Sequence, residues 1–240
     1  MKINIKELIK EYDGQRILDR MSIDLEDVQV LAFIGPSGSG KSTLLRLIAG
    51  LEEFQGGDIA INDRWMSEEG LEDYRKKVGF VFQDHNLFSH LSIFENIALV
   101  LEKVHGKDRS EFEDEVKSLL SFLGLADHYH KLPHQISGGQ SQRASIVRAL
   151  SIKPEIILLD EPTSSLDPIL TYEVLHAIKQ LVDEQRDVVL VTHEIGFAKS
   201  VADYVIFMDE GRIIEHGSDI LNNPQTETLQ RFLDKVLSFN

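Results

Sequence analysis

Residues 28–47, VQVLAFIGPSGSGKSTLLRL, constrain the fold of this 240-residue chain more than any other segment. A short apolar run that ends in glycine is typical of a buried strand. The residues after it match the pattern G-x-x-x-x-G-K-[ST] and lead into a helical pattern. Gly35, Gly38 and Gly40 let the backbone curl so that successive N–H groups point at phosphate oxygens. The segment therefore predicts a phosphate-binding loop between a strand and a helix.

The polar side chains of this loop fit a nucleoside triphosphate. Lys41 would reach the β- and γ-phosphates as a point charge, and the Ser42 hydroxyl would coordinate Mg²⁺. The helix N-terminus adds its positive end. The predicted nucleotide-binding set is Gly35, Pro36, Ser37, Gly38, Ser39, Gly40, Lys41, Ser42 and Thr43.

Further apolar runs predict an α/β fold. Strand-sized runs recur at 156–160, 188–193 and 205–209. A stretch between the first two has apolar residues at helical spacing: Val174, Leu175, Ile178, Leu181 and Val182. Alternating strands and helices indicate a mainly parallel sheet covered by helices. After the last run, MDEGRIIEHG predicts a hairpin that turns at Glu210-Gly211.

The middle of the chain has a different pattern, without a convincing strand. Its clearest helix places Phe112, Val116, Leu119, Leu120 and Leu123 on one face. We expect a helical subdomain at about 84–150, inserted into a nucleotide-binding core formed by 1–83 and 151–240.

Composition excludes several classes of protein. The net charge of -15 argues against a nucleic-acid-binding surface. The absence of cysteine excludes disulfides, thiolate zinc sites and thiol catalysis. The charged N-terminus lacks the apolar core of a signal peptide, and no run approaches the roughly 20 apolar residues that cross a bilayer. We expect a cytosolic chain whose membrane role, if any, comes through a partner.

One acidic residue ends the strand-like run at 156–160 and another follows it, in ILLDEPTSSLDP. Asp160 is placed to hold Mg²⁺, while Glu161 would position or deprotonate an attacking water. His193 ends the next apolar run, at the edge where parallel sheets gather their ligands, and would contact the γ-phosphate or orient the water. Gln83 follows another strand-like run and could reach Mg²⁺ or a water. Tyr12 could stack on a nucleobase.

A second glycine-rich turn, ISGGQSQR at 136–143, also begins a helix, as phosphate-binding turns do. With this turn, the ordered set GPSGSGKST, VFQ, SGGQ, LLDEPTSSLD and VTH resembles the ATP-binding-cassette (ABC) family of ATPases over nearly the whole chain. The resemblance implies a P-loop core with an N-terminal antiparallel β-subdomain. It makes Glu161 and His193 catalytic, Gln83 the Q-loop glutamine, and Tyr12 the adenine-stacking residue.

The family resemblance also implies a head-to-tail dimer in which each ATP lies between two copies of the chain. The D-loop would be Ser165-Leu166-Asp167. The residues acting in trans would be Ser137, Gly138, Gly139, Gln140 and Asp167, and those around Mg²⁺ would be Ser42, Gln83 and Asp160.

Flanking segments such as VFQDHNLFSHLSIFENI and VTHEIGFAKSVADYVIFMDEGRIIEHG are similar to those of the ATPase subunits of polar amino acid uptake systems. This implies a subunit on the cytoplasmic face of the membrane that drives a separate permease, fed by a substrate-binding protein. The permease is expected to dock near 83–96.

Other functions share parts of this pattern. Another ABC machine, such as one for lipoprotein release or cell division, would have the same motifs. DNA-repair and translation relatives usually carry coiled-coil insertions or two fused cassettes, and neither is present. A small-molecule P-loop kinase has no use for SGGQ, and a module without activity would be expected to lack Lys41 or Glu161.

Overall fold

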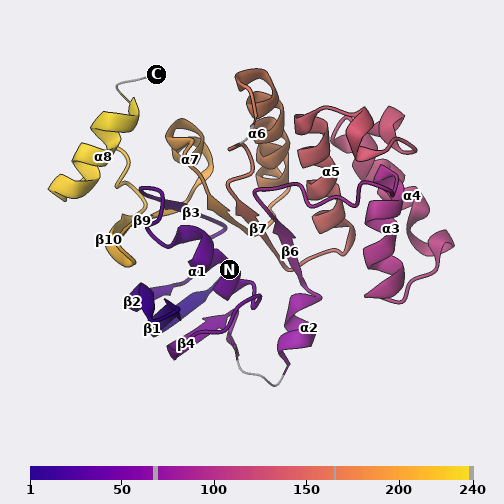
Figure 1. Ribbon diagram of the computed structural model, residues 1–240. Coiled ribbons are helices and arrows are strands. Elements are labelled where there is room, and N and C mark those ends of the chain that lie inside the picture. Colours follow the sequence, from indigo (N-terminus) through magenta and orange to yellow (C-terminus); the bar gives the residue numbers. More distant parts are fainter. Residues whose placement is uncertain (67–69, 165, 238–240) are drawn as a thin grey trace. The chain divides into compact units, whose positions relative to one another are not determined.

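The computed structural model describes residues 1–66, 70–164 and 166–237 (Figure 1). The chain divides into two compact units, one of Met1–Arg75 with Asp187–Asn240 and one of Lys76–Arg186. Each unit is described by itself. The predicted subdomain boundaries at 84 and 150 stay a prediction.

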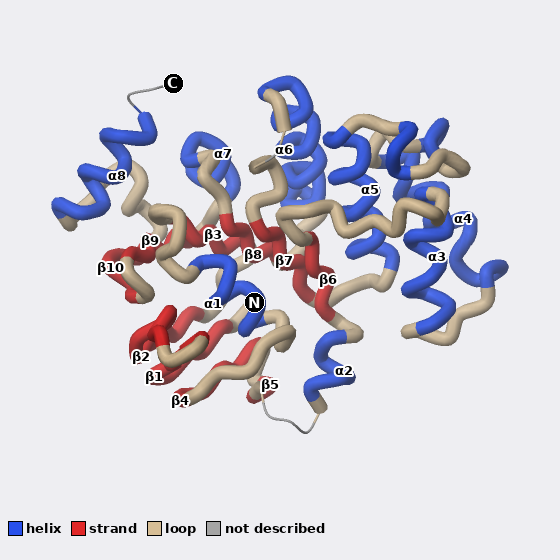
Figure 2. Tube along the Cα trace, in the orientation of Figure 1, coloured by secondary structure: helices blue, strands red, loops and turns tan. Residues whose placement is uncertain are grey.

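The first unit holds two sheets. Its elements are β1 (Ile3–Tyr12), β2 (Gln15–Leu25), β3 (Val30–Ile34), α1 (Lys41–Ile48), β4 (Gly56–Ile61), β5 (Arg64–Trp65), α2 (Leu71–Arg75), β8 (Val188–Val191), α7 (Ile195–Val201), β9 (Tyr204–Asp209), β10 (Arg212–Gly217) and α8 (Glu227–Leu237). Strands β2, β1, β4 and β5 form an antiparallel sheet in that order. Strand β3 pairs in parallel with β8 and with β9. Figure 2 shows α1 between the antiparallel sheet and β3.

The antiparallel sheet is the β-subdomain that the family resemblance implies. Its strand β1 buries Ile3, Ile5 and then Leu8, so the alternation of buried and exposed side chains shifts by one position. Glu7 lies between them with φ 45°, and the register with β2 shifts at the same place. A bulge of this kind hides a strand from a search for strict alternation.

The predicted apolar strands are confirmed. All five residues of β3 are buried, as are all four of β8. Strand β8 ends at Val191 rather than His193, because Thr192 Oγ1 accepts a hydrogen bond from Glu194 N (3.0 Å) and begins a turn. The hairpin between β9 and β10 turns at Glu210 (φ 45°) and Gly211 (φ 74°), as predicted. Two left-handed residues match the twist of a two-residue hairpin loop.

The second unit is mainly helical. Its elements are β6 (Val78–Val81), α3 (Ile93–Lys103), α4 (Arg109–Phe122), η1 (Ala126–His128), η2 (Pro133–Gln135), α5 (Gly138–Ser151), β7 (Ile156–Asp160) and α6 (Pro168–Asp183). Strands β6 and β7 pair in parallel. The predicted helix around 112–123 is α4, which buries Phe112, Val116 and Leu120. It packs with α3 and α5 (Figure 1).

The helix α8 is anchored to the first unit at its start and along its apolar face. Leu229 and Leu233 join a buried cluster with Ile34 and Phe207. The carboxylate of the buried Glu215 accepts hydrogen bonds from Gln225 N (2.8 Å), Thr226 N (2.8 Å) and Thr226 Oγ1 (2.6 Å). Burial by itself would raise the pKa of Glu215, but these three donors outweigh it and hold the pKa below its usual value. None of the helices in the described residues is long and apolar enough to cross a membrane.

Candidate nucleotide-binding and catalytic site

The loop between β3 and α1 requires glycine for two physical reasons. Gly35 has φ 143°, and a Cβ there would lie 2.1 Å from Met208 O. Gly40 has φ 94°, and its Cβ would lie 2.6 Å from Leu18 Cδ2. Gly38 has φ 81° and open space around it, so only its backbone conformation demands glycine. The loop is therefore fixed by packing at its two ends and by left-handed backbone at its tip.

Lys41 closes this loop from inside. Its side chain is buried, and its Nζ donates hydrogen bonds to Gly35 O (2.9 Å) and Pro36 O (2.7 Å). Ser42 and Thr43 follow in the first turn of α1, both half-buried, while Ser37 and Gly38 are exposed at the tip. The structure thus brings a cation and the N-terminus of a helix together, the combination that binds a phosphate anion.

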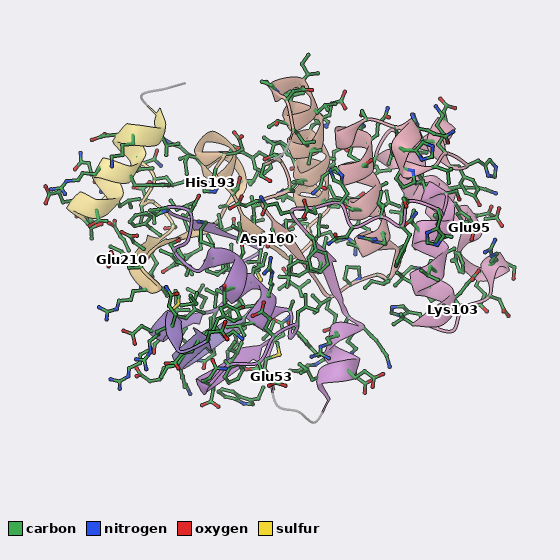
Figure 3. All side chains as sticks on the ribbon, in the orientation of Figure 1. Glu53, Glu95, Lys103, Asp160, His193 and Glu210 are labelled. Atoms are coloured by element: carbon green, nitrogen blue, oxygen red, sulfur yellow. The ribbon has the colours of Figure 1, made fainter. Side chains whose placement is uncertain are left out.

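Two further predicted residues belong to the first unit. Tyr12 ends β1 with 40% of its surface exposed, and its hydroxyl donates to Glu52. Burial, and then the hydrogen bond to Glu52, raise the pKa of Tyr12. Lys10 Nζ lies 4.4 Å from the centre of the Tyr12 ring. His193 is exposed in the segment between β8 and α7 (Figure 3).

The predicted carboxylates lie at the end of β7 in the second unit. Asp160 is its last residue, 1% exposed, and is labelled in Figure 3. Glu161 follows in a left-handed conformation, φ 43°, and is half-buried. Because Val81 pairs with Leu159 in the parallel ladder, the segment after β6 that carries the exposed Gln83 leaves the sheet at the same edge. The structure therefore brings Gln83, Asp160 and Glu161 to the carboxyl ends of the paired strands β6 and β7.

The second glycine-rich turn is a capped helix start. Ser137 Oγ accepts from Gln140 N (3.2 Å), and Ser137 N donates to Gln140 Oε1 (3.0 Å), a reciprocal capping box. Ser137 is exposed at this helix start, whereas Gly138 and Gln140 are half-buried and Gly139 is buried. A Cβ on Gly138 would lie 3.2 Å from Leu166 Cδ2, and one on Gly139 would lie 3.0 Å from Leu170 Cβ. These glycines allow α5 to approach the start of α6 closely.

Asp167 lies in the segment that these glycines contact, directly after Leu166. It is the N-cap of α6, and its Oδ1 accepts from Ile169 N (2.9 Å) and Leu170 N (3.0 Å). The predicted D-loop residue Ser165 lies outside the described residues. Of the residues predicted to act on a partner's nucleotide, Gly138 and Gly139 thus lie close to Leu166 and Leu170, which flank Asp167 in the sequence.

Two residues that pattern reasoning missed hold the segment after β6. Asn96, 1% exposed, accepts from Phe88 N and donates to the carbonyls of Phe88, Leu91 and Ser92. Arg148 donates to the carbonyls of His85 and Asn86. No sequence signal marks such residues, because their partners are backbone carbonyls, which every residue has.

A glycine-rich loop closed around a lysine at a helix start, together with carboxylates after an apolar parallel strand, defines a P-loop ATPase. Within the described parts of the chain, no group of three His, Asp or Glu side chains forms a metal-binding cluster. A magnesium ion brought with the nucleotide needs no such cluster, since phosphates supply much of its coordination.

The comparisons with known proteins define the family. The model of the family described as ABC transporter matches residues 18–164. The L-cystine transport system ATP-binding protein TcyN of Escherichia coli is 44% identical, over 98% of both chains. The glutamine transport ATP-binding protein GlnQ of Escherichia coli is 42% identical, over 98% of this chain and 99% of that one. This chain belongs to the ABC transporter family and is one of its ATP-binding, ATP-hydrolysing cassettes.

Solved structures agree with this fold. A dimeric structure of the ATP-binding cassette MJ0796 in a post-hydrolysis state, bound to ADP and Pi, has a TM-score of 0.80 and 31% identity. The match covers 90% of this chain and 98% of the MJ0796 chain. The structure of an ATP-binding subunit of an ABC transporter also has a TM-score of 0.80, with 26% identity over 97% of this chain and 99% of that one.

Proposed function

We propose that this chain is the ATPase subunit that energises uptake of polar amino acids through a separate membrane permease. The observation that carries the proposal is its likeness over nearly the whole chain to the ATP-binding proteins of cystine, glutamine and arginine transport systems, the last at 40% identity. The alternative of lipoprotein release or cell division has no such support among these relatives.

The proposed chemistry assigns each residue a physical task. Lys41 and the N–H groups at the start of α1 would bind the phosphates, and the exposed ring of Tyr12 would stack on adenine. Glu161 would accept the proton of the attacking water, and His193 would hold the γ-phosphate or the water.

Magnesium fits the oxygen ligands available. The Ser42 hydroxyl, the Asp160 carboxylate and the Gln83 amide oxygen are hard donors of the kind that Mg²⁺ prefers, and Mg²⁺ when bound would neutralise charge on the phosphates. We assign these three residues to it as proposed ligands.

The second copy of the chain would complete each site. Ser137, Gly138, Gly139, Gln140 and Asp167 would act on the nucleotide held by the partner's P-loop. The exposed position of Ser137 at the start of α5 supports this, since the N-terminus of a helix favours a bound anion. ATP would then join two copies, and hydrolysis would release them, because the bridging γ-phosphate is lost.

The permease would dock on 83–96, and the substrate-binding protein would act through the permease. This places the working chain on the cytoplasmic face of the membrane. Charge reversal at Asp84 and Glu95 should weaken assembly with the permease, and unchanged assembly would refute the docking site.

Replacement of Glu161 by Gln tests the catalytic assignment. The variant should keep Mg²⁺-dependent ATP binding, as measured by equilibrium dialysis, and lose at least about a hundredfold in hydrolysis rate. Glu210→Gln is the matched control, because it makes the same chemical change at an exposed carboxylate in the hairpin turn, outside the proposed site. A Glu161→Gln variant that hydrolyses ATP at nearly the wild-type rate would show that another group is the general base.

Transport of labelled polar amino acids tests the physiological proposal. Cells that lack this chain should lose uptake of at least one of them and regain it with the wild-type chain but not with Glu161→Gln. Normal uptake of all of them in the deletion strain, together with loss of another membrane process, would contradict the amino acid assignment while leaving the ATPase assignment intact.

A further inference from the structure

The segment between β6 and α3, residues 82–92, is held by side chains from two helices of the same unit. We call this segment the Gln83 loop. Asn96 fixes its second half through four hydrogen bonds to Phe88, Leu91 and Ser92. Its first half, which carries Gln83, is held from α5.

Arg148 supplies the main contact from α5. Its Nη1 donates to Asn86 O (2.6 Å) and its Nη2 to His85 O (3.1 Å). Gln142 is fully buried on α5, in the part of the helix before Arg148, and adds a long hydrogen bond from Nε2 to Phe82 O (3.5 Å). Asn86 adopts φ 48°, a conformation that Asn tolerates better than most residues, so the loop turns where Arg148 holds it.

The charge of Arg148 is not balanced by a neighbouring acid. Within the described residues it has no carboxylate partner, and burial lowers its pKa. Arg143, on the same helix, is the opposite case, because it pairs with Glu173 Oε2 (2.8 Å) besides donating to Leu123 O (3.0 Å). A half-buried guanidinium without a counterion is stabilised chiefly by the carbonyl dipoles it binds, so it holds the loop firmly.

Helix α5 therefore links two predicted functional segments. It begins at the Ser137 turn, and Arg148 lies eleven residues on, about 16 Å along the helix axis. Arginine suits this role because its planar fork donates to two carbonyls at once, whereas a lysine ammonium is a single point charge.

We propose that Arg148 is a positioning residue: it holds the Gln83 loop on the helix that presents Ser137, so that Gln83 keeps its catalytic place and moves with that turn. This inference rests on the proposed role of Gln83. It concerns a residue that touches neither the nucleotide nor the metal in the proposed mechanism, and acts only through the backbone of the loop.

A double-mutant cycle in the full chain tests the inference. Arg148→Met should lower kcat for ATP about tenfold and leave KM within about twofold, because a displaced catalytic group costs rate more than binding. The Gln83→Ala, Arg148→Met double variant should be no slower than Gln83→Ala alone, since both changes remove the same function. Arg148→Lys should recover part of the rate.

Arg143→Met is the matched control on α5. Its fold-loss in kcat should multiply with that of Gln83→Ala, because the two residues act independently. Hydrogen exchange gives a second readout: Arg148→Met should speed exchange of the amides at 82–87, and Arg143→Met should not. Unchanged exchange there, or an Arg148→Met effect that multiplies with Gln83→Ala, would overturn the inference. Wild-type kcat in Gln83→Ala, with faster exchange in Arg148→Met, would instead overturn the proposed role of Gln83.

Discussion

The loop before α1 and the turn before α5 both place glycines at the start of a helix, and their backbones differ. Gly35, Gly38 and Gly40 have positive φ, so the chain itself curls around the buried Lys41. Gly138 and Gly139 have ordinary helical geometry, and what they provide is clearance toward α6. The first turn encloses its cation, while the second exposes a capped helix end. This contrast is what we expect if one turn holds a phosphate and the other closes on it from a partner.

The largest effect on stability is expected from Gly35→Ala, which tests whether packing fixes the loop before α1. The new Cβ would lie 2.1 Å from Met208 O with φ at 143°, so we expect a loss of about 3 kcal/mol or more in the free energy of unfolding. Gly38→Ala, with open space around it, should lose only about 1 kcal/mol from its left-handed backbone. Chemical denaturation of both variants measures this, and equal losses would show that packing does not fix the loop.

A second comparison separates the two turns by nucleotide affinity. Lys41→Ala removes the buried ammonium and should weaken ATP binding to the isolated chain about a hundredfold. Ser137→Arg should leave that affinity within about twofold, because its turn serves another copy's nucleotide. Fluorescence titration with a labelled ATP measures both, and equal loss of affinity would contradict the division of roles.

A third variant tests whether the second turn needs glycine for close packing of α5 against α6. Gly139→Ala places a Cβ 3.0 Å from Leu170 Cβ, which must shift or push α5 from α6, at a cost of about 1–2 kcal/mol. The control is Gly196→Ser in α7, because a new Cβ there meets nothing within 4 Å. If Gly139→Ala proves as stable as the control by thermal unfolding, close approach is not the reason for that glycine.

The smallest expected effect lies outside both turns, at Glu215. Its folded pKa is below its usual value, so the unfolded chain binds more protons as pH falls, and stability is lost as pH drops through the folded pKa. Glu215→Gln should cost about 1 kcal/mol at neutral pH and flatten this acid dependence. Glu210→Gln, in the exposed hairpin turn, should retain the wild-type profile. Identical profiles for the three proteins in thermal unfolding would refute the assignment.

Sequence reasoning succeeded where residue type follows directly from backbone or burial. The run 156–160 was predicted at the observed bounds of β7 because every residue in it is buried. Gly35 and Lys41 are predicted from the phosphate-loop pattern, which allows few other residues, and their contacts with a nucleotide stay a prediction. The sheet of β1, β2 and β4 came only from the family resemblance, since bulges such as the one at Glu7 break the alternation that marks a strand.

Other parts of the site depend on contacts between distant residues. Nothing in SGGQ indicates that Gly139 faces Leu170, 31 positions later. Nor does the sequence indicate that the Asp167 carboxylate caps α6. Arg148 was missed because an arginine on an amphipathic helix ordinarily points to solvent, and its partners here are carbonyls of a loop. Tertiary contacts of this kind have no local pattern.

The central claim, that the two turns act on one nucleotide from two copies, is tested most directly by mixing two defective chains. Both carry Glu161→Gln to prevent hydrolysis, one adds Lys41→Ala and the other Ser137→Arg, and the two carry different affinity tags. Neither should dimerise alone with ATP, but the mixture should form ATP-dependent heterodimers that co-purify, because one site then combines an intact Lys41 with an intact Ser137. A mixture that stays as monomeric as its separate components would contradict the account.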